Sequence, residues 1–230
     1  MRRAADKLSR AVTPLVVSEV FFAFDNLKPY ASTFTGRRID AVETRGKALL
    51  IHFDNDLSIY THNQLYGRWM IRPPYRYPVT NRQLRLAIHN ERQSALLYSA
   101  SEIEVLPRQQ LDVHPFLATL GPDVLTIKPR RVLEQLAAST HQRRRLGSLF
   151  LDQRFLAGIG NYLRSEILFV AGLHPRLRPV DCREDALERL ARAAVAVSRQ
   201  SYRHNGVTND LEMARQLRAQ GQPRSQYRHW

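Results

Sequence analysis

Short apolar stretches separated by turn residues dominate the first half of the chain. A short opening helix is predicted ahead of Pro14, with one face formed by Ala4, Ala5, Leu8 and Ala11. The next segments are rich in Val, Ile, Leu and aromatic residues, as is typical of strands, and we expect strands at 16–24, 48–53, 57–62, 68–71, 84–88, 95–99 and 103–106. Many short strands with close turns predict an antiparallel sandwich or barrel.

The spacing of apolar residues changes to a helical period from about Pro107 onward. Helical spacing is found in the segments 111–117, 132–137, 146–150, 162–170 and 186–202, whereas the tail after Asn205 is polar and weakly patterned. Gly121-Pro122-Asp123 and Lys128-Pro129 interrupt the pattern, so the best linker candidate is 121–129. The prediction is an α+β protein with a β domain at residues 1–120, a linker at 121–129 and a helical domain at 130–230.

The charge is strongly basic and favours a polyanionic partner. The 230 residues carry 35 Lys and Arg against 21 Asp and Glu, a net charge of +14 at pH 7. Such an excess attracts nucleic acid, although a solvated basic surface is the alternative. The single cysteine, Cys182, excludes a disulfide framework and a multi-cysteine zinc site within these residues. With no long apolar run, we expect a protein of the reducing cytoplasm and no membrane contact.

The segment from Phe155 to Glu166 is the sharpest local signal for chemistry. Gly158 and Gly160 permit a tight turn, and Asn161 is a good N-cap residue for the next helix. The amides at the start of that helix would hold a phosphate. A dinucleotide fingerprint is rejected because Leu163 stands where its third glycine belongs. The alternative of an ordinary corner between two helices stays open.

Two further segments place candidate binding residues at strand ends. Lys47 precedes a strand of buried character, where an amine can bind phosphate or polarise a reacting group; a solvated lysine is the alternative. Gln64, Leu65 and Tyr66 lie between two strands, where an aliphatic and an aromatic side chain could enter a base stack. The alternative for this triplet is a hydrophobic plug of the core. The histidines show no metal-ligand spacing.

Taken together and in this order, these segments resemble the formamidopyrimidine-DNA glycosylase superfamily, and within it the endonuclease VIII branch. The resemblance extends over nearly the whole chain and is carried by the segments 27–30, 43–50, 62–67, 97–101, 114–117, 121–125 and 155–166. It implies an N-terminal β-sandwich followed by a helical domain with a helix-two-turn-helix, and double-stranded DNA bound between them.

The resemblance also implies a function and a role for each candidate residue. It implies a monomeric, bacterial base-excision repair enzyme, a DNA glycosylase with abasic-site lyase activity that acts on damaged duplex DNA. Lys47 matches a lysine that contacts phosphate and assists at the lesion, and Asn161 matches a residue that holds the DNA backbone. Gln64, Leu65 and Tyr66 match the residues that fill the space left by a flipped-out nucleotide. This triplet favours oxidised pyrimidines over oxidised purines as the damaged base.

Two departures from the family pattern concern the ends of the chain. Family members begin with Pro-Glu-Gly-Pro-Glu after the initiator Met; the proline amine attacks the sugar and the glutamate moves protons. Here Met1-Arg2-Arg3 matches the residues that come directly after that motif in the family. The family's four-cysteine finger, with its structural zinc, is expected beyond Trp230, so no cofactor is expected within this chain. Displaced ends are the favoured interpretation; the alternative is a catalytically impaired remnant that binds damaged or kinked DNA without excision.

Overall fold

The computed structural model describes residues 1–230, which divide into two compact units, Met1–Ala118 and Thr119–Trp230. The α+β class predicted from the sequence is confirmed, because the first unit is built on antiparallel sheets and the second is helical. No helix has the length and the apolar character that crossing a membrane requires.

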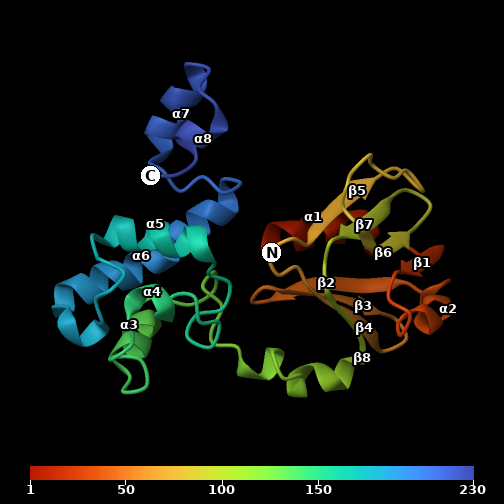
Figure 1. Ribbon diagram of the computed structural model, residues 1–230, viewed down its shortest axis with the longest axis horizontal. Helices are drawn as coiled ribbons and strands as arrows, with labels where there is room; N and C mark the ends of the chain where they lie inside the picture. Colours follow the sequence, from red (N-terminus) through yellow and green to blue (C-terminus); the bar gives the residue numbers. More distant parts are fainter. The chain divides into compact units, whose positions relative to one another are not determined.

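The first unit is a sandwich of two four-stranded antiparallel sheets (Figure 1). One sheet has the order β1-β6-β7-β5 and the other the order β2-β3-β4-β8. The unit opens with helix α1 (Arg2–Val12), which contacts strands of both sheets. The strands are β1 (Glu19–Phe22), β2 (Ile39–Arg45), β3 (Ala48–Phe53), β4 (Leu57–His62), β5 (Arg68–Arg72), β6 (Leu84–His89), β7 (Ser94–Tyr98) and β8 (Glu102–Pro107).

The core of this unit lies between the sheets and explains its most apolar segments. Strand β3 is an inner strand of its sheet and is buried at all six positions. The predicted helix α1 closes the core with a buried stripe of Ala5, Leu8 and Ala11, and ends at Val12 before a cis Thr13–Pro14 bond. Ala4, also expected on this face, is only partly buried. The strand that the sequence pattern missed is β2, an edge strand whose Asp40 and Glu43 obscured its alternation.

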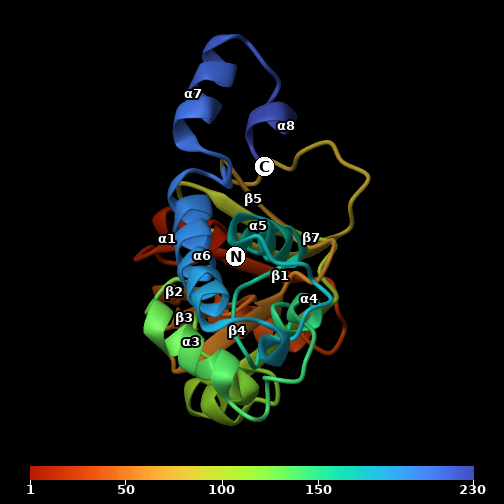
Figure 2. The ribbon, with the colours of Figure 1, turned by 90° about the vertical axis from the view of Figure 1, so that its left-hand side faces the viewer.

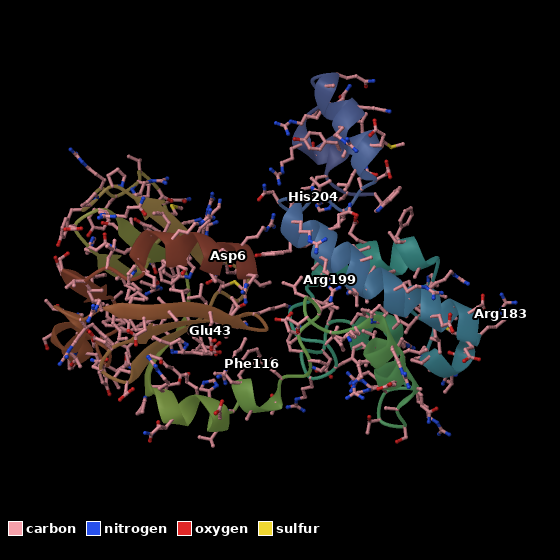
Figure 3. The ribbon with its side chains drawn as sticks, turned by 180° about the vertical axis from the view of Figure 1, so that it is seen from behind. Asp6, Glu43, Phe116, Arg183, Arg199 and His204 are labelled. Carbon is pink, nitrogen blue, oxygen red and sulfur yellow. The ribbon has the colours of Figure 1, made fainter.

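The second unit packs two helices, α3 (Pro129–Ala137) and α5 (Asn161–Ala171), against the long helix α6 (Glu184–Arg203) (Figure 2). The remaining helices are α4 (Leu146–Leu149), η4 (Pro179–Asp181), α7 (Leu211–Ala219) and α8 (Arg224–Tyr227). The short segment before α3 is packed into this unit: the guanidinium of Arg199, labelled in Figure 3, donates to the carbonyls of Leu125 and Ile127 at 3.0 and 2.9 Å.

Two regions differ from the helical pattern read from the sequence. The segment with helical spacing around Leu111 forms 3₁₀ turns, η2 (Arg108–Val113) and η3 (Leu117–Thr119), instead of an α-helix. The weakly patterned tail contains α7 and α8. Helix α7 is started by a local signal, since the Asp210 carboxylate accepts hydrogen bonds from the amides of Glu212 and Met213. Capping thus compensates for a narrow apolar face.

Candidate nucleic-acid interface

Three strand ends meet at one edge of the β2-β3-β4-β8 sheet. Ala48, at the start of β3, pairs with His62 at the end of β4, and His62 pairs in turn with Glu102 at the start of β8. The residues just beyond these pairs are therefore neighbours at the same edge. They include Lys47 and the loop that begins after His62, so the structure brings together two of the segments singled out in the sequence.

Lys47 occupies the second position of the two-residue turn between β2 and β3. Gly46 takes the first position with φ +60°, a conformation that glycine adopts without steric cost. The Lys47 side chain is half-buried and no carboxylate pairs with it, and burial lowers the pKa of its amine. An unpaired ammonium in a poorly hydrated position is costly for the folded protein alone, and a phosphate would relieve that cost.

The loop after β4 projects apolar side chains into solvent. The amide of Gly67 donates to the Asn63 carbonyl at 2.7 Å, and a side chain at Gly67 would approach the Asn63 Cα to 2.6 Å, so the loop closes tightly only with glycine there. Leu65 is 82% exposed and Tyr66 is 71% exposed. These two side chains are therefore not a plug of the hydrophobic core.

Gln64, in contrast, is held in place by its surroundings. Its backbone has φ +45°, a left-handed conformation that is uncommon for a non-glycine residue. Its side-chain oxygen accepts a hydrogen bond from the Ser101 hydroxyl at 2.8 Å, and its side-chain nitrogen donates to Glu102 at 3.2 Å. The loop is braced again where Arg82 donates to the Tyr66 carbonyl at 2.7 Å.

His62 links the loop to Lys47. Its Nδ1 accepts a hydrogen bond from the Gln64 amide at 3.3 Å. Its ring forms a T-shaped pair with the ring of Phe116, labelled in Figure 3, at a centroid distance of 5.2 Å. Burial lowers the pKa of His62, the nearby Glu102 opposes this shift and the charge of Lys47 adds to it. The imidazole is therefore suited to the neutral form that this hydrogen bond requires.

Asn161, the remaining candidate, lies in the second unit at the first position of α5. The expectation that it caps this helix is wrong: Gly160 is the N-cap residue, with φ −122° and ψ −178°, and no side chain caps the helix. Because Gly160 takes the N-cap position, the Asn161 side chain lies one residue too late to cap the helix. This side chain is exposed and makes no hydrogen bond within the protein. The first backbone bond at this end runs from the Arg164 amide to the Gly160 carbonyl, which leaves the preceding amides open.

Gln153, which the sequence pattern did not single out, shapes the turn ahead of Asn161. Its side-chain nitrogen donates to the carbonyls of Leu151 and Ile159 at 2.9 and 3.0 Å, and its side-chain oxygen accepts from the Gly158 amide at 3.0 Å. Glutamine in a loop carries no signal of such a role in sequence alone. Ser101, Glu102 and Arg82 were missed as well, because the role of each depends on a contact with a residue far away in the chain.

No three His, Cys, Asp or Glu side chains gather in a way that could hold a metal ion. Two features suit a polyanion. One is the site formed by Lys47 and the loop of residues 63–67, called the strand-edge site below, and the other is the start of α5.

Comparisons of the sequence with protein-family models and of the fold with solved structures point to one family. Residues 3–100 match the formamidopyrimidine-DNA glycosylase N-terminal domain, and residues 120–212 match the formamidopyrimidine-DNA glycosylase H2TH domain. The solved structure of the Lactococcus lactis Fpg in complex with DNA containing an abasic site has a TM-score of 0.75 at 16% identity, over 87% of this chain and 76% of that chain. This likeness shows a shared fold.

The chain belongs to the formamidopyrimidine-DNA glycosylase family of proteins. Within that family its relatives include Endonuclease 8 of Escherichia coli, 45% identical over 212 residues that make up 91% of this chain and 81% of the relative. Endonuclease 8 of Pectobacterium carotovorum is 44% identical over the same shares of the two chains. The resemblance stated from the sequence motifs is confirmed.

Proposed function

We propose that this protein is a base-excision repair DNA glycosylase with abasic-site lyase activity, which removes oxidised pyrimidines from duplex DNA. The observation that carries the proposal is the strand-edge site, where two exposed apolar side chains stand on a braced loop beside a half-buried, unpaired lysine. Family membership and Endonuclease 8 relatives at 44–45% identity support it.

The loop is suited to replacing a base in the stack. Leu65 and Tyr66 present an aliphatic and an aromatic group to solvent side by side, and neither contributes to the hydrophobic core. Inserted into a duplex, they would fill the space behind a flipped-out nucleotide, and Gln64 would stand beside them. Lys47, at the same sheet edge, would bind a phosphate next to the lesion and assist the chemistry there.

The start of α5 is suited to the DNA backbone. Asn161 offers an amide side chain free of internal hydrogen bonds, next to open backbone amides at the positive end of an 11-residue helix. A phosphate held there would orient the duplex without reading its sequence. The net charge of +14 supplies the long-range attraction.

The covalent chemistry needs an amine nucleophile. Its nitrogen forms a bond to C1′ as the bond from C1′ to the damaged base breaks and the base leaves with a proton. The C1′–O4′ bond of the sugar ring then opens, O4′ takes a proton, and the imine formed at C1′ permits elimination of the 3′ and then the 5′ phosphate. By resemblance that amine belongs to the proline of a Pro-Glu-Gly-Pro-Glu motif, with Lys47 in an assisting role.

A zinc finger of the family's kind does not fit residues 1–230, which hold one cysteine, and would draw its ligands from outside them. We also propose a bacterial cytoplasmic location and action as a monomer.

Borohydride trapping tests this proposal, because reduction makes only an imine between protein and DNA permanent. Residues 1–230 are compared with a version that carries Pro-Glu-Gly-Pro-Glu ahead of Met1, processed to expose the proline, with and without a four-cysteine finger after Trp230. The extended proteins should be trapped on a thymine-glycol duplex and release the base, whereas 1–230 should not. Tight, selective binding of abasic duplex without trapping by any version would instead identify a non-catalytic protein that recognises damaged DNA.

A further inference from the structure

The loop at residues 63–67 is tied to strand β8 by a carboxylate with two separate bonds. Oε1 of Glu102 accepts the Tyr60 hydroxyl at 2.8 Å, and Oε2 accepts Nε2 of Gln64 at 3.2 Å. Tyr60 is fully buried, and burial together with this hydrogen bond raises the pKa of its hydroxyl, so Tyr60 is a permanent donor. One oxygen of Glu102 is thus fixed by the core, and the other is presented to the loop.

The position of Glu102 is set by the sheet and not by the loop. Glu102 pairs with His62, and Tyr60 lies two residues earlier on the same face of β4, within diagonal reach. Because the carboxylate is located by β4 and β8, its place does not depend on the conformation of the loop. A side chain fixed in this way can act as a template for a neighbouring flexible segment.

The Gln64 amide has only one orientation that satisfies its neighbours. Ionised Glu102 accepts and cannot donate, so it requires the NH₂ group of Gln64; the Ser101 hydroxyl then donates to the amide oxygen at 2.8 Å. The same two contacts hold Gln64 while its backbone keeps φ +45°, a conformation that costs energy for a residue with a side chain. This backbone turn precedes the two residues that project from the loop.

We propose that Glu102 is a positioning residue for lesion recognition: it orients the Gln64 amide and, together with Ser101, maintains the loop conformation that presents Leu65 and Tyr66 to DNA. This inference rests on the proposed function, because it assigns a role within the same site. In this proposal Glu102 acts through its hydrogen bond to Gln64 and not through a contact of its own with DNA. Preorganisation of this kind lowers the entropy that the loop loses on binding.

A double-mutant cycle in DNA binding tests the inference. The measured quantity is the ratio of the dissociation constants for intact duplex and for duplex with a tetrahydrofuran abasic analogue. Glu102→Ala should lower this ratio about five- to tenfold, the effect of losing one hydrogen bond of ordinary net strength. In a Gln64→Ala background the same substitution should change the ratio less than about twofold, because the residue through which Glu102 acts is gone.

The matched control is Glu104→Ala. Glu104 lies on β8, like Glu102, and its Oε1 is 3.5 Å from Nε2 of His114. Because Glu104 makes no hydrogen bond to the loop, its replacement should leave the ratio unchanged. Ser101→Ala should lower the ratio and Ser101→Thr, which keeps the hydroxyl, should restore it. Thermal melting of each variant is the check that it is folded, so that a lower ratio is not a result of unfolding.

The outcomes separate this inference from the proposed function. If Glu102→Ala lowers the ratio equally with and without Gln64, or if Glu104→Ala has the same effect, Glu102 does not act through Gln64 and the inference is overturned. If the unmodified protein binds intact and abasic duplexes equally, lesion recognition by this site is overturned as well.

Discussion

The imidazole of His62 accepts a hydrogen bond from the backbone amide of Gln64, with 3.3 Å between Nδ1 and N. The last residue of β4 therefore holds the first turn of the exposed loop. Only an unprotonated Nδ1 can accept, and the half-buried amine of Lys47 lies close enough to disfavour a second positive charge. Loop geometry and the protonation state of one histidine are thus coupled.

A pH dependence of stability is expected from this relationship. Burial lowers the pKa of His62 in the folded protein, below the value of about 6.5 expected for the unfolded chain. The unfolded state therefore binds the proton more readily. The stability contributed by neutral His62 is complete above about pH 6.5 and is lost as the pH falls toward and through the lowered pKa.

His62→Asn isolates this contribution, because Asn keeps an acceptor near the position of Nδ1 and does not titrate. We expect the unfolding free energies of the wild type and this variant to diverge as the pH falls below about 6.5, with the wild type losing more. Chemical denaturation at a series of pH values measures the difference. Parallel curves would show that His62 is not a titrating support of the loop.

Lys47 should weaken the fold slightly while serving DNA binding. Because burial lowers the pKa of its amine, the charged form is less favourable in the folded chain than in the unfolded chain at neutral pH. Lys47→Met should therefore leave the unfolding free energy unchanged or raise it. DNA affinity should fall, and the slope of log affinity against log salt should decrease by about 0.9, the value for one phosphate contact.

Lys28→Met is the matched control for this substitution, because Lys28 is exposed and pairs with Asp25 at 2.7 Å. Lys28→Met should not appreciably change the unfolding free energy, the DNA affinity or the slope of log affinity against log salt. A Lys47→Met protein that loses stability and retains its full salt dependence would contradict a phosphate-binding role.

Asn161→Ala should weaken binding to every duplex by a similar factor. The side chain makes no internal hydrogen bond and is exposed, so the unfolding free energy should change by no more than about 0.5 kcal/mol. The ratio of affinities for abasic and intact DNA should stay the same, because phosphate contacts orient the duplex without reading it. Fluorescence anisotropy with several unrelated duplexes measures this, and the exposed Asn81→Ala serves as the control. A loss confined to abasic DNA would place Asn161 at the lesion instead.

The sequence predicted the parts of this molecule that depend on local pattern. The hairpin of β3 and β4 is predicted by two apolar segments around Asp54-Asn55-Asp56, and α1 by its spacing and by Pro14. The place of Glu102 beside Gln64 could not be predicted, because it depends on β8 pairing with β4 across three intervening strands, 38 residues away. Asn161 lost its predicted capping role because Gly160 adopts an extended conformation that a sequence pattern does not specify.

The exposed side chain of Leu65 offers the most direct test of the central claim, that the strand-edge loop recognises damaged duplex DNA. Leu65→Ala should leave the melting temperature unchanged, since the side chain is 82% exposed, and should remove most of the preference for abasic over intact duplex. Val79→Ala, which alters a fully exposed apolar residue outside this loop, should leave that preference intact. The measurement is the ratio of dissociation constants for the two duplexes in the wild type and both variants. A large ratio that falls only in Leu65→Ala is the predicted result. A ratio that Leu65→Ala does not change, or a loss of stability of about 2–5 kcal/mol as for a buried leucine, would contradict the claim.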